Sequence, residues 1–416
     1  MASLSVATER SMKVLLCHNY YQHPGGEDSA YLAERDLLTR FGHQVQEYIR
    51  RNEEVQVDGC WSKVSLGLQT IWADQSSREI RTLLKRERPD IVHFHNTFPL
   101  ISPAAYYACR DAGVPVIQTI QNYRLVCPAA SLYRNGHPCR ECLDHSLWRG
   151  VQHKCYRQSR SVTATVALML AFHRWRQTWS EMVDRYIVAT EFVRSKLVEG
   201  GLPAEKITVK TNFIFPDPGM REGTGEYALC VSRLVPEKGV RTVLEAFKRL
   251  PNTIPLRIVG DGPLRSELEA QRNGQNLPNV RFEGWLPRQR ELESMSGARF
   301  LISASEWFEP FGMNIVEAFA CGVPVITSSS GGPQEIVEAG RTGMHFRAGD
   351  PDDLAAKVQW AWGHPVELQA MGKAARAEYE AKYSGERNYQ LLMKIYDETW
   401  SIRQAQSDSI ALTEER

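Results

Sequence analysis

Short apolar runs alternate with amphipathic stretches along most of this chain. In the first half, runs rich in Val, Ile and Leu predict buried strands, and between them apolar residues recur at a spacing near 3.6 residues, which predicts helices. Buried strands that alternate with helices are joined by right-handed crossovers and form a parallel sheet. The strands are expected at 12–19, 43–49, 90–96, 114–120 and 185–191, and the helices at 27–42, 76–88 and 102–113.

A second series of the same kind begins near Tyr227. The segment 211–226 between the two series contains Pro216, Pro218 and several glycines without periodicity, which is typical of a domain boundary. We therefore predict an α/β protein with two doubly wound, Rossmann-like domains, at 12–215 and 223–384. The strands of the second series are expected at 227–234, 255–262, 279–286, 298–305 and 323–329.

One more helix is predicted after the second domain, at 385–403. Its apolar residues lie on roughly one face, and because it has little sheet of its own to cover, we expect it to cross back to the first domain. The residues 404–416 are expected to form a disordered tail. The apolar face contains Tyr389, Leu392, Ile395, Tyr396 and Trp400.

The charges of the chain are balanced, with 50 basic and 49 acidic residues and a formal net charge of +1. This balance gives no electrostatic reason to expect nucleic acid as a partner. The N-terminus lacks a basic start followed by a long apolar core, and no window reaches about eighteen uninterrupted apolar residues. We therefore expect a cytoplasmic protein.

Basic and aromatic residues gather at 148–179, where Trp148, Trp175 and Trp179 accompany an apolar helix. This pattern is compatible with a helix that lies on the inner face of a membrane, where local positive charge attracts lipid and a lipid-linked acceptor is within reach. It is also typical of a long core helix with polar ends.

Four loops with glycines or basic residues come where strands are expected to end. In an open α/β sheet, ligands bind at this edge, and glycine lets the backbone approach a phosphate closely. Arg233 and Lys238 add two cations that can clamp a diphosphate. Each loop alone is also compatible with an ordinary turn. The glycines concerned are Gly25, Gly26, Gly260, Gly262, Gly331 and Gly332.

Two glutamates, Glu309 and Glu317, stand eight residues apart after the expected strand 298–305. Glu309 is expected in the loop and Glu317 on the following helix, with Pro310 and Gly312 turning the chain between them. The loop carboxylate can accept hydrogen bonds from sugar hydroxyls, and the helix carboxylate can hold a ribose diol. The alternative is an acid favoured by the helix dipole and a surface glutamate.

The ordered motifs SRLVPEKG, VGDGP, EPFG, EAFACGVPVI and GGPQEIV together resemble family-4 retaining glycosyltransferases, whose GT-B fold has two domains that face a cleft. The resemblance covers roughly 227–354, and PGGED near the N-terminus is similar to the Gly-Gly loop of that family. It implies that Arg233 and Lys238 bind the diphosphate of a nucleotide-sugar donor. It also implies that Glu309 lies near the donor sugar and that Glu317 binds the ribose.

The resemblance further implies that the backbone around Phe311 and Gly312 meets the sugar hydroxyls, with Gly331, Gly332 and Glu335 supporting the pocket. Retention in this family is thought to need neither a protein nucleophile nor a catalytic metal. The acceptor hydroxyl attacks the face that the diphosphate leaves, and the leaving phosphate takes its proton. Cationic side chains would stabilise the charge on the leaving group.

The sequence departs from the family at one catalytic position. Where the family has a strand-end histidine that points at the transferring sugar, QTIQNYR places Gln121. Glutamine can hydrogen-bond to a hydroxyl but cannot titrate, so either catalysis does not need the imidazole or the activity is reduced. His93 and His95 are candidates for a partial substitute, with a structural role as the alternative.

Four of the nine cysteines fall in one insertion at 127–155. A Cys-x-x-Cys pair flanked by two further cysteines is compatible with a structural tetrahedral zinc site. A disulfide pair or free thiols are the alternatives. The insertion is expected to face the cleft, where an acceptor enters. The four residues are Cys127, Cys139, Cys142 and Cys155.

The sequence thus predicts a retaining hexosyltransferase that moves a sugar from a nucleotide-diphosphate sugar to a hydroxyl of a glycan or lipid-linked glycan, as in cell-surface polysaccharide biosynthesis. One alternative is an enzyme of the same fold with a small soluble acceptor. Another is a catalytically weakened protein that binds nucleotide or glycan. An NAD-dependent Rossmann enzyme is disfavoured, because neither first strand is followed by a compact G-x-G-x-x-G turn.

Overall fold

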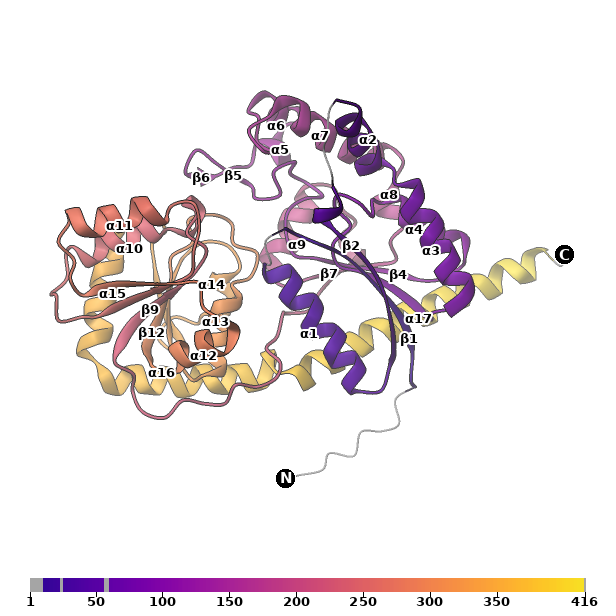
Figure 1. Cartoon of the computed structure of the whole chain (residues 1–416). Coiled ribbons are helices and arrows are strands. Elements are labelled where there is room, and N and C mark those ends of the chain that lie inside the picture. Colours follow the sequence, from indigo (N-terminus) through magenta and orange to yellow (C-terminus); the bar gives the residue numbers. More distant parts are fainter. Residues whose placement is uncertain (1–9, 23–24, 56–59, 415–416) are drawn as a thin grey trace.

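The computed structural model describes residues 10–22, 25–55 and 60–414. Within them, two six-stranded parallel sheets confirm the predicted doubly wound architecture (Figure 1). A separate pair of two-residue strands, β5 (Tyr133–Arg134) and β6 (His137–Pro138), forms a small antiparallel hairpin in the insertion.

The first sheet has the strand order β2-β1-β3-β4-β7-β8. Its central strands are fully buried and rich in Val and Ile, as expected for strands that are covered on both faces. One face packs against α3, α4, α7 and α9, and the other against α1 and α17. The strands are β1 (Lys13–Tyr20), β2 (Gln44–Arg51), β3 (Ile91–Phe94), β4 (Val116–Ile120), β7 (Arg185–Val188) and β8 (Ile207–Val209).

The second sheet has the order β11-β10-β9-β12-β13-β14. Helices α10, α11 and α15 pack on one face and α12, α13 and α14 on the other, while α16 contributes to both cores. The strands are β9 (Tyr227–Val231), β10 (Leu256–Val259), β11 (Val280–Gly284), β12 (Ala298–Ser303), β13 (Val325–Ser328) and β14 (Gly343–Phe346).

The edge strands β8 and β14 were not predicted from the sequence. β8 has only three residues, and β14 reads Gly-Met-His-Phe with two half-buried positions. An edge strand of this kind carries a weak apolar pattern because one of its sides faces solvent. Both strands form only because an already assembled sheet offers them a pairing partner.

The helices alternate with the strands and shield the sheets from solvent. Those of the first half are α1 (Gly26–Arg40), α2 (Cys60–Ile71), α3 (Asp74–Glu87), α4 (Ala104–Asp111), α5 (Glu141–Asp144), α6 (Trp148–Gln152), α7 (Arg160–Trp175), α8 (Thr178–Glu181) and α9 (Glu191–Glu199). Those of the second half are α10 (Val240–Phe247), α11 (Arg265–Gly274), α12 (Arg288–Ser296), α13 (Met313–Ala320), α14 (Pro333–Ile336), α15 (Pro351–Gly363) and α16 (Pro365–Glu378). Short 3₁₀ turns occur at Asn52–Glu54, Ala204–Lys206 and Pro236–Lys238, and a π-helical turn at Tyr379–Tyr383 leads into α17.

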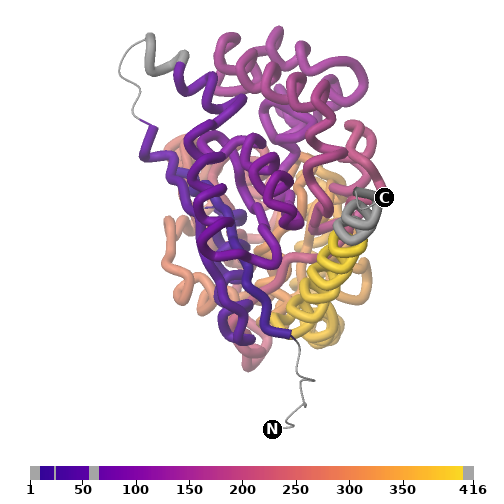
Figure 2. The backbone as a smooth tube through the Cα atoms, turned by 90° about the vertical axis from the view of Figure 1, so that its right-hand side faces the viewer, coloured from indigo at the N-terminus to yellow at the C-terminus, as the bar shows by residue number. Residues whose placement is uncertain are grey.

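The last helix, α17 (Gly385–Glu414), crosses back to the first domain as the sequence predicts. Figure 1 and Figure 2 show it in yellow, running from the second domain along the side of the first. Its predicted apolar face is buried there, with Leu392 and Tyr396 fully enclosed in one core with β1 and α1 residues. Helical backbone continues to Glu414, so the disordered tail predicted from residue 404 is wrong up to that point. The segment 404–414 contains neither Gly nor Pro to stop the helix.

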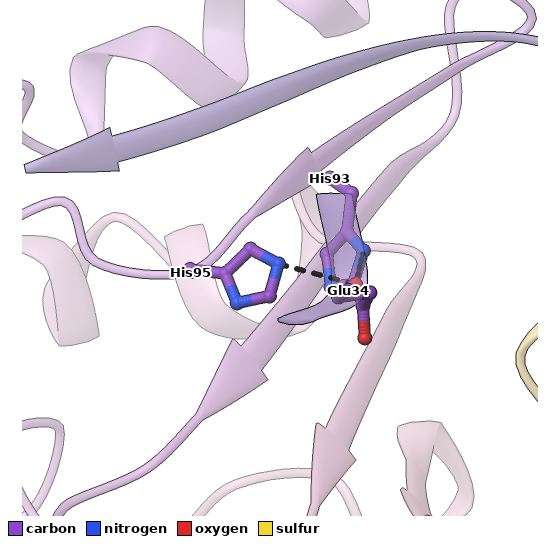
Figure 3. Close-up of side chains that lie close together, drawn as sticks. All are labelled: Glu34, His93 and His95. Atoms are coloured by element: carbon purple, nitrogen blue, oxygen red, sulfur yellow. Dashed lines mark hydrogen bonds and ion pairs between the residues drawn. The ribbon is translucent and has the colours of Figure 1, made fainter. Parts of the chain in front are cut away.

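A buried polar network lies between α17 and the first sheet (Figure 3). The Glu34 carboxylate lies 2.9 Å from His93 Nδ1, 3.1 Å from His95 Nε2 and 3.1 Å from Lys210 Nζ. Lys210 also donates to Asn388 at 2.8 Å, and His93 Nδ1 lies 2.8 Å from the Tyr396 hydroxyl, so the network reaches α17 through two polar contacts. The histidines are therefore structural residues under α17, and neither is among the residues that line the cleft described below.

The same network explains the ionisation of Glu34. Burial opposes the charged form, but the nearby Lys210 ammonium and the two histidines outweigh it and hold the pKa of Glu34 well below its usual value. Its stabilising contribution is therefore present above the ordinary pKa of a glutamate and is lost only when pH falls through the depressed value. Among the described residues, Glu34, His93 and His95 alone place three metal-ligating atoms within 4.8 Å of one another. The Lys210 ammonium already neutralises that carboxylate, which disfavours a metal cation there.

Removing Lys210 should destabilise the protein strongly. Lys210→Met leaves the Glu34 carboxylate buried without its cation, and we expect a loss of about 3–5 kcal/mol in the free energy of unfolding. Thermal unfolding followed by circular dichroism checks this value. Lys394→Met is the matched control, because Lys394 is exposed on α17 and its replacement should cost less than about 0.5 kcal/mol. Equal melting temperatures for the two variants would show that the network does not anchor α17.

Candidate active site

A cleft of about 590 Å³ lies between the two sheets, at the carboxyl ends of their strands. Loops after β1 and β4 form one wall, and loops after β9 and β12 form the other. The structure brings to this cleft eight of the residues singled out in the sequence, namely Gly25, Gly26, Gln121, Arg233, Lys238, Glu309, Phe311 and Gly312. The convergence follows from the parallel topology, since strands of one direction end at one edge.

Glu309 is the buried acid of the second-domain wall. It is 8% exposed, and its Oε2 atom accepts hydrogen bonds from Ser305 Oγ and Trp307 Nε1, each at 2.8 Å, and from Lys238 Nζ. Burial opposes ionisation, but the Lys238 ammonium and these three donors outweigh it and lower the pKa of Glu309. The carboxylate is therefore ionised at neutral pH.

The two cations predicted for a diphosphate lie on the loop after β9. Lys238 ends the 3₁₀ turn Pro236–Lys238 and pairs with Glu309 across the two loops. Arg233 is exposed at the same cleft. The two side chains thus border the same cleft, which Glu309 also lines.

Gly260 and Gly262 do not line the cleft but pack beneath it. A Cβ atom at Gly260 would lie 1.9 Å from the Ser232 carbonyl oxygen, and one at Gly262 would lie 2.6 Å from that of Leu234. The Leu234 amide donates to the Asp261 carbonyl at 2.9 Å, which ties the two loops together. The role of this pair is to let the β10 loop support the loop that carries Arg233.

Gly331 and Gly332 have the same role beneath Glu309. A Cβ atom at Gly331, where φ is +73°, would lie 2.4 Å from the Glu309 carbonyl oxygen, and the Gly332 amide donates to that oxygen at 2.8 Å. The close approach of the two backbones fixes the position from which the Glu309 side chain enters the cleft.

Glu335 joins the two domains. Its carboxylate accepts hydrogen bonds from the backbone amides of Glu191 at 2.9 Å and Phe192 at 2.6 Å, at the N-terminus of α9. Burial raises the pKa of this carboxyl, against the effect of both amides. Beside it, Thr190 Oγ1 donates to the Pro310 carbonyl at 2.9 Å. These contacts tie the Glu309 loop to the first domain.

Glu317 lies on α13, behind the residues that line the cleft. It is 7% exposed and accepts a hydrogen bond from Arg288, which also lies 3.0 Å from Glu291. Burial and the neighbouring Glu317 charge raise the pKa of Glu291 to about 7. Met313 and Asn314, in the first turn of α13, are the residues of this helix that border the cleft.

The first-domain wall of the cleft is built from amides. Gln121 and Asn212 form a reciprocal pair, each donating to the other at 2.9 Å. Asn122 donates to Glu27, and burial raises the pKa of that carboxyl against hydrogen bonds from Tyr21 and Asn122. This wall therefore offers hydrogen-bonding groups, among them a carboxyl whose pKa is raised by burial.

Several lining residues were not singled out in the sequence. Glu27 had a usable signal, because it directly follows the Gly25–Gly26 pair at the start of α1. The others belong to no motif that we singled out, and five of them lie in loops, whereas Asn314 lies at the start of α13. They include Tyr21, Asn122, Arg157, Asn212, Trp307 and Asn314.

The four cysteines of the insertion lie around one small cavity of about 10 Å³. A hydrogen bond from the Cys142 thiol, opposed by burial and assisted by the backbone N–H groups of Leu132 and Ala129, lowers the pKa of Cys127 to about 6. The same contact and burial raise the pKa of Cys142. The cysteines thus favour one thiolate beside a thiol, and the structural zinc stays a prediction.

Two family models match adjacent parts of the chain. Residues 36–217 match the model described as Glycosyltransferase Family 4, and residues 215–378 match the model described as Glycosyl transferases group 1. The chain belongs to glycosyltransferase family 4. The match agrees with the resemblance seen in the ordered motifs and extends it to the first domain.

Among its relatives, the glycogen synthase of Mycobacterium tuberculosis is 30% identical over 302 residues, which is 70% of this chain and 64% of that protein. An uncharacterized glycosyltransferase of Methanocaldococcus jannaschii is 27% identical over 215 residues, 52% of this chain and 60% of the relative. The chain therefore matches less than two thirds of the length of these relatives.

Solved structures of similar proteins have the same two-domain GT-B fold. HepE of Anabaena, in complex with UDP and glucose, is 18% identical and aligns with a TM-score of 0.66 over 93% of this chain and 99% of that one. The sucrose-phosphate synthase of Thermosynechococcus elongatus is 16% identical, with a TM-score of 0.69 over 94% and 100% of the two chains. Among the described residues, no helix is long and apolar enough to cross a membrane.

The backbone contact beneath Glu309 makes a specific prediction. Gly331→Ala should displace the Glu309 loop, lower the melting temperature and weaken any ligand that Glu309 contacts. The matched control is Gly340→Ala, at which φ is also positive, +81°, but a Cβ atom meets nothing within 4 Å. The control should cost only about 1–2 kcal/mol for the left-handed backbone, and Gly331→Ala about 1–3 kcal/mol more for the collision. Equal effects of both variants on unfolding would contradict the close packing.

Proposed function

We propose that the chain is a retaining glycosyltransferase that transfers a sugar from a nucleotide-diphosphate sugar to a hydroxyl of a glycan or lipid-linked glycan. One observation carries the proposal. The ionised Glu309 and the cations Lys238 and Arg233 border the same cleft from one domain, while the Gly25–Gly26 turn and the amide wall face them from the other. Such a cleft matches a donor with an anionic diphosphate and a hydroxylated sugar.

Each donor group has a complementary partner in the cleft. The diphosphate fits Arg233 and Lys238, and the sugar hydroxyls can donate to the Glu309 carboxylate. Lys238 already pairs with Glu309, so it is shared between this acid and the incoming phosphate. Glu317 is held by Arg288 behind the cleft, so to bind the ribose diol that we assign to it, its carboxylate must exchange this contact for the diol. HepE of Anabaena was solved with UDP and with UDP-glucose, which makes uridine nucleotides the first donors to test.

The resemblance to retaining glycosyltransferases implies the reaction, and these placements supply the groups that it needs. The bond between the anomeric carbon and the diphosphate oxygen breaks, and the acceptor oxygen forms a bond to the same face of that carbon. The acceptor proton passes to the leaving phosphate, so no carboxylate needs to act as nucleophile. Arg233 and Lys238 stabilise the negative charge that gathers on the diphosphate, which is electrostatic catalysis by groups already in position.

Gln121 stands where the family has a histidine, but its side chain is an amide and not an imidazole. Because its amide is locked by Asn212, it presents a fixed hydrogen-bonding group that does not titrate. We assign it to orienting the transferring sugar rather than to proton transfer. Because glutamine does not titrate, this position has no group for proton transfer, which supports the second candidate function, a nucleotide- or glycan-binding protein with weak catalysis.

A lipid-linked acceptor is supported by the surface near the insertion. Trp175 and Leu168 of α7 are 77% and 48% exposed, and Trp148 of α6 is 47% exposed. Arg174 and Arg176 are exposed at the end of α7. Exposed aromatic and aliphatic groups beside arginines match a membrane surface with anionic headgroups. A small soluble acceptor is the alternative, and it would need no such surface.

Donor binding can be measured before the acceptor is known. A thermal-shift panel with UDP, GDP, ADP and their common sugars should give a specific rise in melting temperature for one base, because ligand at a hundred times its Kd stabilises by about 2.7 kcal/mol. Arg233→Ala and Glu317→Ala should remove the shift. Arg290→Ala is the control, since Arg290 is exposed on α12 and should keep it. If the folded wild-type chain shows no shift with any nucleotide, the donor site is wrong.

Catalysis is tested by release of nucleoside diphosphate from the preferred donor. Glu309→Gln should keep the nucleotide thermal shift but lower the rate by at least about a hundredfold, as loss of a preorganised charged group does. Gln121→Ala removes one orienting amide and should lower the rate about tenfold, which corresponds to about 1.4 kcal/mol. A wild-type chain that binds nucleotide but releases no nucleoside diphosphate from the donor would favour the binding-protein candidate instead.

A further inference from the structure

The part of the insertion that follows Leu132 buries little of its own apolar surface, whereas Val126, Cys127 and Leu132 before it belong to the first-domain core. From residue 133 to residue 160, only Leu147 and Gly150 are buried. It consists of the β5–β6 hairpin, the four-residue helix α5 and the five-residue helix α6. A segment of this size without a core is normally stabilised by disulfides or a bound metal.

Four cysteines take positions where they can supply that stabilisation. Cys127 precedes the hairpin, Cys139 follows it, Cys142 lies on α5 and Cys155 follows α6. All four are free thiols, and all four line the same cavity of about 10 Å³. That volume is about the size of a single small atom or water molecule.

We propose that Cys127, Cys139, Cys142 and Cys155 bind one Zn²⁺ ion that holds the insertion together. Four thiolates in tetrahedral array are a standard ligand set for structural zinc, which favours sulfur donors. In this structure the four do not include three sulfur atoms within 4.8 Å of one another, so the thiols turn toward the cavity when the metal binds. Binding releases the thiol protons and leaves a Zn–S₄ unit with two negative charges.

The surroundings of the cavity suit this negative charge. Arg134 and Arg149 line it, and the Arg134 guanidinium interacts with Cys139. Glu141 opposes them in part, because it lies 3.2 Å from Arg134. The Arg134 Nε atom is buried without a hydrogen-bond partner, so one donor remains available to a metal-bound sulfur.

The metal would also fix a part of the insertion that reaches the second domain. Figure 1 shows the β5–β6 hairpin projecting toward that domain. Tyr133 on β5 lies within electrostatic reach of Glu237, Glu306 and Arg241. Glu237 directly precedes Lys238, and Glu306 lies in the loop after β12 that also contains Glu309. Zinc at the base of the hairpin would therefore hold it beside the loops of the cleft.

Metal analysis of the full chain tests the proposal. Protein expressed with zinc in the medium and purified in reducing buffer without chelator should contain one zinc per chain by mass spectrometry. Cys139→Ser and Cys142→Ser should lose the zinc, because each removes a ligand. Even residues that only hydrogen-bond to a metal ligand raise the metal affinity by about 10–100-fold. Cys109→Ala is the control, because Cys109 is buried in the first-domain core and does not line the cavity, so this variant should keep the zinc.

A second measurement does not depend on the variants folding. Wild-type chain stripped of metal should take up one equivalent of Co²⁺ and develop the visible absorption of a tetrahedral site with the near-ultraviolet band of sulfur ligation. A folded wild-type chain that neither contains zinc nor takes up Co²⁺ would overturn the proposal. So would zinc that persists in both serine variants, or disulfides found among the four cysteines by thiol counting. None of these readouts uses donor or acceptor, so their failure is separate from failure of the proposed function.

Discussion

The arrangement of the two domains depends on the ion pair between the buried carboxylate of Glu34 and Lys210. This carboxylate lies under α17, where Lys210 neutralises its charge and Lys210 in turn binds Asn388 of that helix. A charge in such a place is tolerated only because every neighbour is already oriented toward it. Since α17 begins in the second domain and packs on the first, this network fixes where the second sheet stands relative to the first.

The opposite side of the domain interface is fixed by weaker contacts that end at the cleft. Glu335 caps α9, and Thr190 holds the Pro310 carbonyl beside Glu309. The Glu309 loop, which lines the cleft, is thereby tied to the start of α9 in the first domain. A change in the α9 contact would move the acid itself, because Gly331 and Gly332 pack directly against the backbone of Glu309.

The two walls of the cleft differ in their chemistry, and the difference suits a transfer between two unlike substrates. The second-domain wall carries fixed charges, with an acid and a lysine that lower the cost of each other's burial. The first-domain wall offers amides and the buried Glu27, whose pKa is raised by burial. Charges suit an anionic donor, whereas neutral hydrogen-bonding groups suit a hydroxylated acceptor.

The sequence by itself determined the alternation of strands and helices, the two-domain architecture and the crossing of α17. The reason is that the spacing of apolar residues and the length of apolar runs indicate which side chains are buried. The ordered motifs also pointed to the family and to Arg233, Lys238 and Glu309. The sequence did not reveal the edge strands β8 and β14, which need an assembled sheet, or the continuation of α17 beyond residue 403.

Only the tertiary structure decided which of these residues share a surface. Gln121 pairs with Asn212, and His93 and His95 lie in the network beside α17. Four glycines support the cleft from beneath, namely Gly260, Gly262, Gly331 and Gly332. The physical reason is that periodicity records whether a side chain is buried but not against what. Partners that lie 91 residues apart, as Gln121 and Asn212 do, are chosen by the packing of whole sheets and helices.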